Sequence, residues 1–148
     1  MTYRIEPFEN PAHRTQVISL WEAVFGYEAP HNAPELVIDK KRAVSDGLFF
    51  VALDQDEVIG TVMAGYDGHR GWIYAIAVAA ARRQQGLGSA LLAFAEKRLA
   101  EQGCMKINLQ IMADNEAVAA FYRSNGYTTE RRISMGKALV DNIAIAIY

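Results

Sequence analysis

The order of apolar and polar positions divides the chain into alternating extended and helical segments. Unbroken or alternating apolar runs of strand length predict strands, and apolar residues that recur every three or four positions predict helices. Strands are expected around Tyr3 and Ile5, at 48–53, 58–66, 72–78 and 105–112, with one or more within 127–139. Helices are expected at 11–25, 32–44, 88–102 and 115–125.

Capping and stop residues mark the ends of the first and last helices. Asn10 can cap the first helix, with Pro11 in its first turn, and Gly26 ends it. Asn115 can cap the last helix, and Gly126 ends it. Each of these signals has a stereochemical cause, so they predict both ends of the two helices.

Short connections between the central strands predict how they pair. The turns at 54–57 and 67–71 join three successive strands, which should form an antiparallel meander. The helix at 88–102 then separates two strands that should run parallel, because a helical crossover carries the chain back across the sheet. We therefore predict a single α/β domain over 1–148, with a mostly antiparallel sheet, one parallel pair and about four helices.

The junction between the strand at 72–78 and the next helix is a candidate ligand site. Gly86 and Gly88 have no Cβ to hold a ligand away, and Arg82 and Arg83 bring positive charge beside them. A helix that begins on such a loop points unpaired N–H groups outward, and its dipole favours an anion. A pyrophosphate would fit there, whereas the alternative is a tight turn with solvated arginines. The loop lacks the Gly-x-Gly-x-x-Gly and Gly-Lys-Ser/Thr signatures of two common nucleotide sites.

Two ordered motifs make the chain resemble the GNAT family of N-acetyltransferases. The first is Arg-x-x-Gly-x-Gly at 83–88 after the strand residues 76–78, which looks like the family's acyl-CoA signature. The second spans 115–127, with asparagine at its start, Phe-Tyr at 121–122 and Gly-Tyr at its end, at the usual distance from the first. Within the family, the segment 60–71 most resembles the small bacterial YpeA type.

This resemblance implies a GNAT-like fold and transfer of an acetyl group from acetyl-CoA to a primary amine, by direct attack in a ternary complex. In the family, two parallel strands splay apart, and the pantetheine arm of the cofactor pairs with the backbone of the earlier strand. The tyrosine at the position of Tyr122 protonates the leaving thiolate, which makes Tyr122 the expected catalytic acid. The cofactor-binding residues are then Ile76, Ala77, Val78, Arg83, Gln84, Gln85, Gly86, Leu87, Gly88, Ser89, Asn115 and Tyr122.

The acceptor, a small-molecule or protein amine, is less well defined. In the family, the loop between the first two helices covers the acceptor side of the cleft. Tyr27, Glu28 and His31 are therefore candidates for acceptor selection, and an ordinary solvated loop is the alternative.

The sequence does not identify which group acts as the general base. Many members carry glutamate five residues before the asparagine, but this chain has Gln110 there, and an amide cannot take a proton. The amine proton must then leave through another carboxylate, through Asp67, His69 or Tyr74, or through water. Asp67 can equally serve only as a turn residue that bonds its own backbone.

Composition argues against several other classes of protein. At 148 residues, with 51% hydrophobic residues and a net charge of −2, the chain should form one domain that binds neither nucleic acid nor an anionic membrane. The single cysteine, Cys104, fits a reducing, cytoplasmic compartment and is expected to be a small buried filler. No apolar run approaches the length of a membrane span. His31, His69 and Cys104 are too scattered for a metal site, so none is expected.

A rival function is a non-catalytic acyl-CoA-binding or regulatory domain of the same fold. Gln110 in place of a base favours it, whereas Tyr122 argues against it, because a mere binding site needs no acid there.

The carboxyl-terminal tail, 139–148, alternates isoleucine with other residues and would be an exposed apolar edge if nothing covered it. It either packs on its own domain or forms a homodimer contact.

Overall fold

The computed structural model describes residues 2–26 and 33–139. Over these residues it has one five-stranded sheet, four α-helices and a 3-10 turn. The strands are β1 (Arg4–Pro7), β2 (Phe49–Asp54), β3 (Glu57–Tyr66), β4 (Gly71–Val78) and β5 (Ile107–Asn108). The helices are α1 (Arg14–Phe25), α2 (Ala33–Val44), η1 (Ala80–Arg82), α3 (Leu87–Glu101) and α4 (Glu116–Ser124). None of these helices is both long and apolar enough to cross a membrane.

The strands lie across the sheet in chain order, from β1 to β5. Neighbouring strands from β1 to β4 pair antiparallel, and β4 pairs with β5 in parallel. This arrangement confirms the mixed sheet predicted from the short turns and the helical crossover.

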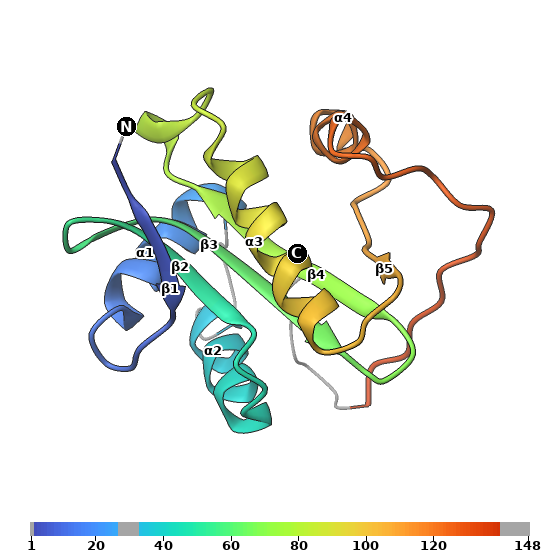
Figure 1. Ribbon diagram of the computed structural model, residues 1–148, viewed down its shortest axis with the longest axis horizontal. Helices are drawn as coiled ribbons and strands as arrows, with labels where there is room; N and C mark the ends of the chain where they lie inside the picture. The colour runs from blue at the N-terminus through green and yellow to red at the C-terminus, as the bar shows by residue number, and fades with distance from the viewer. Residues whose placement is uncertain (1, 27–32, 140–148) are drawn as a thin grey trace.

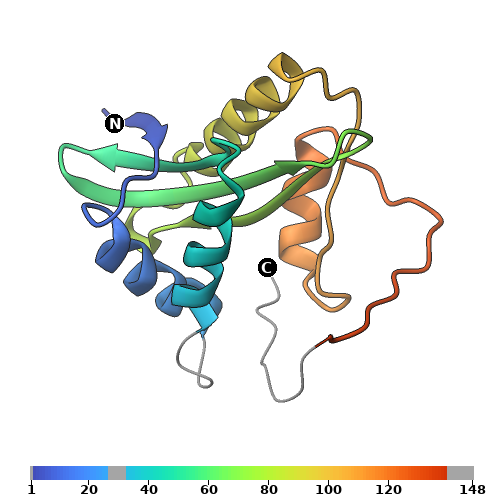
Figure 2. The ribbon, with the colours of Figure 1, turned by 90° about the horizontal axis from the view of Figure 1, so that it is seen from below.

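Helices cover both faces of the sheet. Figure 1 shows α3 lying across one face, and Figure 2 shows α1 and α2 together on the opposite face. Leu91 and Leu99 of α3 are completely buried in the first layer, as are Trp21 of α1 and Ile38 of α2 in the second. Burial of each such side chain contributes about 1.5–3 kcal/mol, so these two layers hold the sheet in place.

A β-bulge interrupts β4 at its centre. The register against β3 shifts between Thr61 and Met63, and Ala75 has a φ of 54°, in the left-handed region. As a result Tyr74 and Ala75 both pack toward α1 and α2, whereas the side chain of Ile76 packs toward α3. The bulge therefore changes the direction of the strand just before the predicted cofactor-binding residues.

A buried hydrogen-bond chain holds this bulge. The Nε1–H of Trp21 donates to Thr61 Oγ1 at 2.9 Å, and the Thr61 hydroxyl donates to the carbonyl oxygen of Ala75 at 2.9 Å. Thr61 and Trp21 are both fully buried. Because an unpaired carbonyl would be costly there, the Thr61 hydroxyl stabilises the bulged conformation.

We expect Thr61→Val to destabilise the protein by about 1–3 kcal/mol, because valine keeps the shape but leaves the Ala75 carbonyl without its donor. Urea denaturation measures the change in the free energy of unfolding. The matched control is Thr15→Val on the exposed side of α1, which should change stability little. Equal stabilities of the two variants would contradict the role of Thr61.

Three elements differ from the sequence predictions by more than a residue or two. Helix α1 begins at Arg14 and not at Pro11, because His13 accepts the N–H of Glu9 at 3.0 Å and closes a turn before the helix. The strand predicted at 105–112 is reduced to the two residues of β5, and no strand forms within 127–139, although that whole range is described.

Side-chain bonds replace the expected strand pairing in this region. The segment 128–135 runs beside β5, but it is joined there by side chains and has no backbone ladder. The bonds run from Lys106 and Asn108 to Glu130, and from Gln110 to Ser134. The hydrophobic pattern predicted two extended segments here. It did not predict that side-chain bonds, and not a backbone ladder, would join them.

Cys104 is half-buried, where the sequence suggested a small buried filler. Its Sγ donates to the carbonyl oxygen of Lys106 at 3.3 Å. A Cβ on Gly71 would lie 2.7 Å from this sulfur, so the cysteine does fill space against β4.

Candidate functional site

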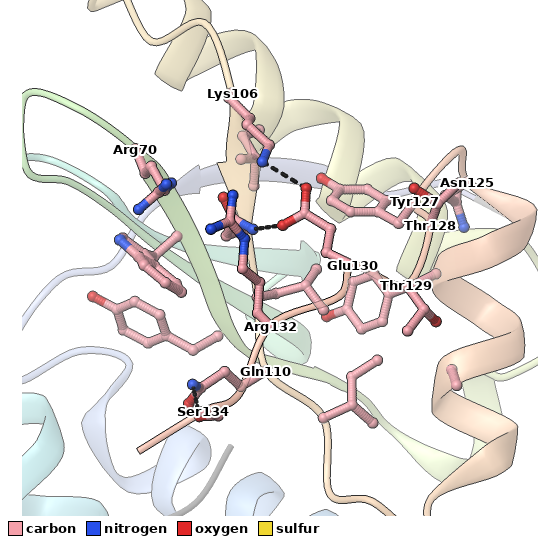
Figure 3. A pocket seen from close by; sticks show the side chains of 18 of the residues that line it. Arg70, Lys106, Gln110, Asn125, Tyr127, Thr128, Thr129, Glu130, Arg132 and Ser134 are labelled. Atoms are coloured by element: carbon pink, nitrogen blue, oxygen red, sulfur yellow. Dashed lines mark hydrogen bonds and ion pairs between the residues drawn. The ribbon is translucent and has the colours of Figure 1, made fainter. Parts of the chain in front are cut away.

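A cavity of about 1460 Å³ lies between β4, β5, α4 and the segment 128–135 (Figure 3). Its lining includes four residues that the sequence singled out: Tyr74, Gln110, Asn115 and Tyr122. These residues are separated by up to 48 positions in the chain, and the splayed edge of the sheet brings them together.

The two parallel strands, β4 and β5, separate after a short paired stretch. Strand β5 pairs with β4 only at Gly71 and Trp72, after which β4 continues to Val78 without it. The chain beyond β5 leaves the sheet toward α4 (Figure 1). The edge of β4 from residue 73 onward is therefore outside the β5 ladder, which leaves backbone groups that another extended group can pair with.

The loop before α3 presents an anion-binding arrangement. Gly86 is the N-cap residue of α3 with a φ of 80°, and no side chain caps this helix end. The N–H of Ala90 is bonded to the Gly86 carbonyl oxygen, so the N–H groups of residues 87–89 precede the first intrahelical bond. They can donate to an anion at the positive end of the helix dipole.

The two arginines of this loop differ in their availability. Arg82 is paired with Asp54 at 2.7 Å, so its charge is already balanced. Arg83 is exposed, and its Nε donates to the carbonyl oxygen of Val78 at 3.4 Å. The expectation that both arginines add charge at the loop therefore holds for Arg83 only.

Gly88 brings α4 against this loop. A Cβ on Gly88 would lie 3.2 Å from a ring carbon of Phe121 and 3.8 Å from Val78. A side chain at this position would push the Phe121 ring slightly away from the start of α3. Tyr122 directly follows Phe121. The candidate catalytic residue therefore lies close to the loop before α3 and to the end of β4.

Tyr122 has a buried ring and a free hydroxyl. The residue is 8% exposed, and its ring packs edge-on against Phe121 and Tyr127, with centroids 5.1 and 5.5 Å away. Its hydroxyl makes no hydrogen bond to any described residue, yet it is not a buried unpaired atom. It therefore opens into the cavity. Burial raises the pKa of Tyr122 to about 12, so the phenol carries its proton at neutral pH.

We expect this burial to make the protein less stable at high pH. The phenol ionises at about pH 10 in an unfolded chain and at about 12 when folded, so the unfolded state loses its proton first. The contribution to stability is complete below about pH 10 and is lost as the pH rises through 12, by up to about 2–3 kcal/mol. Urea unfolding at several pH values should show that the free energy of unfolding falls less steeply with rising pH in Tyr122→Phe than in the wild type. Parallel profiles would contradict the raised pKa.

Tyr127 and Glu96 form a second pair on the cavity wall. The Tyr127 hydroxyl donates to Glu96 Oε2 at 2.6 Å. Burial, followed by the bond to Glu96, raises the pKa of Tyr127. Sequence analysis used Tyr127 only as part of a motif and did not identify this pair.

Asn115 and Gln110 both line the cavity. Asn115 Oδ1 accepts the N–H of Val118 at 3.2 Å, which confirms it as the cap of α4. Its side-chain amide nitrogen makes no hydrogen bond to any described residue. Gln110 bonds Ser134 across the cavity, and the Oδ1 of Asn108 is buried without a partner in the part of the chain described.

Asp67 and His69 lie in the turn between β3 and β4, outside the cavity lining. Asp67 Oδ1 accepts the N–H groups of Arg70 and His69, and these backbone bonds lower the pKa of Asp67. Its Oδ2 accepts from Trp72 at 3.3 Å. Asp67 is therefore a turn residue with both oxygens engaged.

Tyr74 lines the cavity and is held from behind by a buried lysine. Lys41 is 7% exposed, and its ammonium donates to Asp46 at 2.8 Å, to the Ala64 carbonyl oxygen and to the Tyr74 hydroxyl oxygen at 3.4 Å. Its three protons thus have three acceptors. Sequence analysis missed Lys41, although its spacing from Ile38 places it on the buried stripe of α2.

The other predicted site residues divide into two groups. The cofactor residues 76–78 and 83–89 lie at the end of β4 and the start of α3, beside the cavity and not in its lining. Tyr27, Glu28 and His31 lie outside the described residues. Over the described ranges, no three His, Cys, Asp or Glu side chains gather as metal ligands would.

Comparison with known proteins gives one family and many similar folds. A family model described as the acetyltransferase (GNAT) family matches residues 14–127. An aminoglycoside antibiotic 6'-N-acetyltransferase from Acinetobacter haemolyticus superposes with a TM-score of 0.72 at 17% identity, over 93% of this chain and 99% of that one.

Two further structures are similar over nearly the whole chain. Glucosamine-6-phosphate N-acetyltransferase from Arabidopsis thaliana matches with a TM-score of 0.68 at 21% identity, covering 95% of this chain and 100% of that one. Another aminoglycoside acetyltransferase, in complex with a bisubstrate analogue containing CoA, matches with a TM-score of 0.74 at 16% identity, covering 95% and 100%. At these identities the likeness shows the fold alone.

Proposed function

The chain belongs to the acetyltransferase (GNAT) family, and we propose that it transfers an acetyl group from acetyl-CoA to a primary amine. It would act as a single domain over residues 1–148. The observation that carries this proposal is the Tyr122 hydroxyl, which is protonated, has no hydrogen bond to the described residues and faces the cavity beside the cofactor loop. A phenol in this setting is suited to give a proton to a leaving group.

The residues at the start of α3 fit the pyrophosphate of acetyl-CoA. The N–H groups of 87–89 and the exposed Arg83 supply donors and charge, and the positive φ of Gly86 shapes the loop. The edge of β4 at 76–78 lies outside the β5 ladder, so its N–H groups would orient the thioester and polarise its carbonyl. Acetyl-CoA supplies the activated acetyl group, and no metal is needed for this step.

Acetyl transfer balances with one proton donor and one proton acceptor. The amine nitrogen bonds to the acetyl carbon while the carbon–sulfur bond breaks, and Tyr122 gives its proton to the departing sulfur. With a pKa of about 12, Tyr122 gives up this proton only as charge develops on sulfur. We propose direct attack in a ternary complex, because the Cys104 thiol is bonded to a backbone carbonyl and to no base within the described residues.

The amine proton is proposed to leave through water in the cavity. Gln110 cannot accept it, and Asp67 and His69 lie outside the lining. The Tyr74 oxygen already accepts from Lys41. Water that enters the cavity can take the proton without a dedicated carboxylate, so a glutamine at position 110 is compatible with catalysis.

Thiol release from acetyl-CoA in the presence of a panel of primary amines tests the proposal against its rival. Release that depends on the amine and exceeds the amount of protein supports the enzyme. Binding of acetyl-CoA by calorimetry without release from any amine would favour the non-catalytic domain.

Names of the similar structures give acceptor classes without choosing one for this chain. Two are named for aminoglycosides and one for glucosamine 6-phosphate. All are N-acetyltransferases by name, which supports an amine acceptor of some kind. The narrower YpeA-type assignment and a cytoplasmic location stay predictions from the sequence.

We also propose that the tail beyond residue 139 contributes a homodimer contact. The tail from 140 onward lies outside the described residues. The segment that leads into it exposes large apolar side chains, with Ile133 90% and Met135 89% exposed. An apolar edge of this kind is commonly covered by a partner.

We expect deletion of 143–148 to convert a dimer to a monomer in light scattering while the domain stays folded. If the tail packs on its own domain, the deletion lowers the unfolding midpoint instead. A full-length protein that is monomeric at high concentration would contradict the dimer.

A further inference from the structure

Building on the transfer reaction proposed above, we propose that the acceptor amine carries an anionic group, a carboxylate or a phosphate, which Arg70 and Arg132 bind in the cavity. This assignment concerns the acceptor end of the same site. It rests on which charges in the cavity are already paired and which are not.

Every carboxylate in the described lining of the cavity is bonded to another side chain. Three such carboxylates are present, and each accepts from a neighbouring cation, amide or phenol. The pairs are Glu96 with Tyr127, Glu116 with Arg123, and Glu130 with Lys106 and Asn108. An acceptor with several ammonium groups would therefore find no free carboxylate on this wall.

Arg70 and Arg132 are the unpaired charges of the lining. Neither guanidinium forms an ion pair or hydrogen bond with the residues at 2–26 and 33–139. Arg70 is half-buried at the turn before β4, and Arg132 comes from the segment beyond α4. Both side chains line the cavity, although they come from these different elements (Figure 3). Two free guanidinium groups there suit a carboxylate or phosphate, which each can bind through paired N–H groups.

Glu130 does not cancel these charges. Hydrogen bonds from Lys106 and then Asn108 lower the pKa of Glu130, and Arg132 adds a weaker attraction from farther away. Glu130 is thus paired with Lys106, whereas neither Arg70 nor Arg132 has a carboxylate partner among the described residues. The local balance of these four side chains is positive.

Tyr74 adds a hydrogen-bond donor on the same wall. Its oxygen accepts from the buried Lys41, so its own O–H proton is free to point elsewhere. Asp46 also holds the Lys41 ammonium in place, so Lys41 stays the donor and the Tyr74 oxygen stays the acceptor. The Tyr74 O–H can donate a hydrogen bond to a carboxylate or phosphate oxygen of the acceptor amine.

The test uses three amines that differ only in the far group: 6-aminohexanoate, 6-aminohexanamide and 1,6-diaminohexane. We expect kcat/KM for acetyl transfer to be highest for the carboxylate, lower by tenfold or more for the amide, and lowest for the diamine. Calorimetry on the CoA-loaded protein should give the same order of affinities. Equal values for all three, or the best values for the diamine, would overturn the acceptor assignment and leave acetyl transfer standing.

Substitutions separate a binding contact from general charge. Arg70→Gln should remove the preference for 6-aminohexanoate over the amide, with KM rising and kcat little changed, and Arg70→Lys should restore part of it. Arg131→Gln is the matched control, because Arg131 is exposed in the same segment as Arg132 but does not line the cavity. A preference that survives in Arg70→Gln, or that falls equally in Arg131→Gln, would contradict the assignment.

Calorimetry also distinguishes failure of this assignment from failure of the proposed function. If no amine releases thiol but 6-aminohexanoate still binds with an affinity that depends on Arg70, the anion site stands and the transfer reaction falls. If none of the three amines binds or reacts, the acceptor assignment is wrong.

Discussion

Tyr122→Phe is expected to lower the turnover number by about a hundredfold or more, the usual contribution of a positioned general acid. The substitution keeps the ring that packs against Phe121 and Tyr127 and removes only the hydroxyl. Because that hydroxyl has no hydrogen bond within the described chain, the free energy of unfolding at neutral pH should change little. Affinity for acetyl-CoA should also stay close to that of the wild type.

Turnover and the unfolding midpoint should be measured on the same preparation. Tyr66→Phe is a suitable control, because its hydroxyl bonds the backbone at Gly68 and Gly103 and does not line the cavity. This control should keep its activity. A stable Tyr122→Phe protein with wild-type turnover would remove Tyr122 as the acid. The raised pKa of about 12 further implies that a high-pH limb set by Tyr122 lies above the usual assay range.

Gly86→Val is expected to weaken CoA binding by about 3 kcal/mol, or somewhat more than a hundredfold in affinity. A branched side chain on this loop would hold the pyrophosphate away from the N–H groups that begin α3. It would also strain the backbone, because the φ of Gly86 is 80° and valine rarely adopts it. Nothing lies within 4 Å of the new Cβ, so the fold should survive.

Gly47→Val separates backbone strain from lost binding. Gly47 has a φ of 70° and an equally open Cβ position, in the turn between α2 and β2. Both variants should lose some stability, but only Gly86→Val should lose CoA affinity in calorimetry. Unchanged affinity in a folded Gly86→Val protein would remove the loop from the binding site.

Sequence patterns predicted the sheet well where apolar runs and turns coincide. The strands at 49–54, 57–66 and 71–78, their antiparallel pairing and the crossover helix all agree with expectation. The prediction was wrong at 105–112 and 127–139, where side-chain bonds such as Lys106 to Glu130 join the two segments. Such bonds depend on residues far apart in sequence, so no local pattern reports them.

For the candidate site, motif residues were easier to find than the residues that support them. The structure brings Asn115 and Tyr122 of the second motif to one cavity with Tyr74 and Gln110, whereas the first motif lies outside the lining. Their assigned roles stay predictions. Nothing in the sequence predicted the bulge at Ala75 or the buried hydrogen bond from Thr61 to its carbonyl oxygen. Alanine and threonine are both common in strands without a bulge.

Supporting charges were missed for a similar reason. Lys41 had a weak signal, a charged residue on the buried stripe of α2, but its partners Asp46 and Tyr74 come from other elements. Arg70 lies in the predicted turn at 67–71 and was not singled out from the sequence. Its significance depends on the pairing of every carboxylate around it, which only the three-dimensional arrangement shows.

Transfer of a labelled acetyl group tests the central claim most directly. The intact protein is incubated with acetyl-CoA that carries an isotope in its acetyl group and with the panel of primary amines, and the protein and all products are analysed by mass spectrometry. We predict labelled N-acetyl product from at least one amine in amounts that exceed the protein many times, with no label retained on the protein. Acetyl-CoA that binds but yields no labelled amine, or label that accumulates on the protein before any product forms, would contradict direct transfer to an amine.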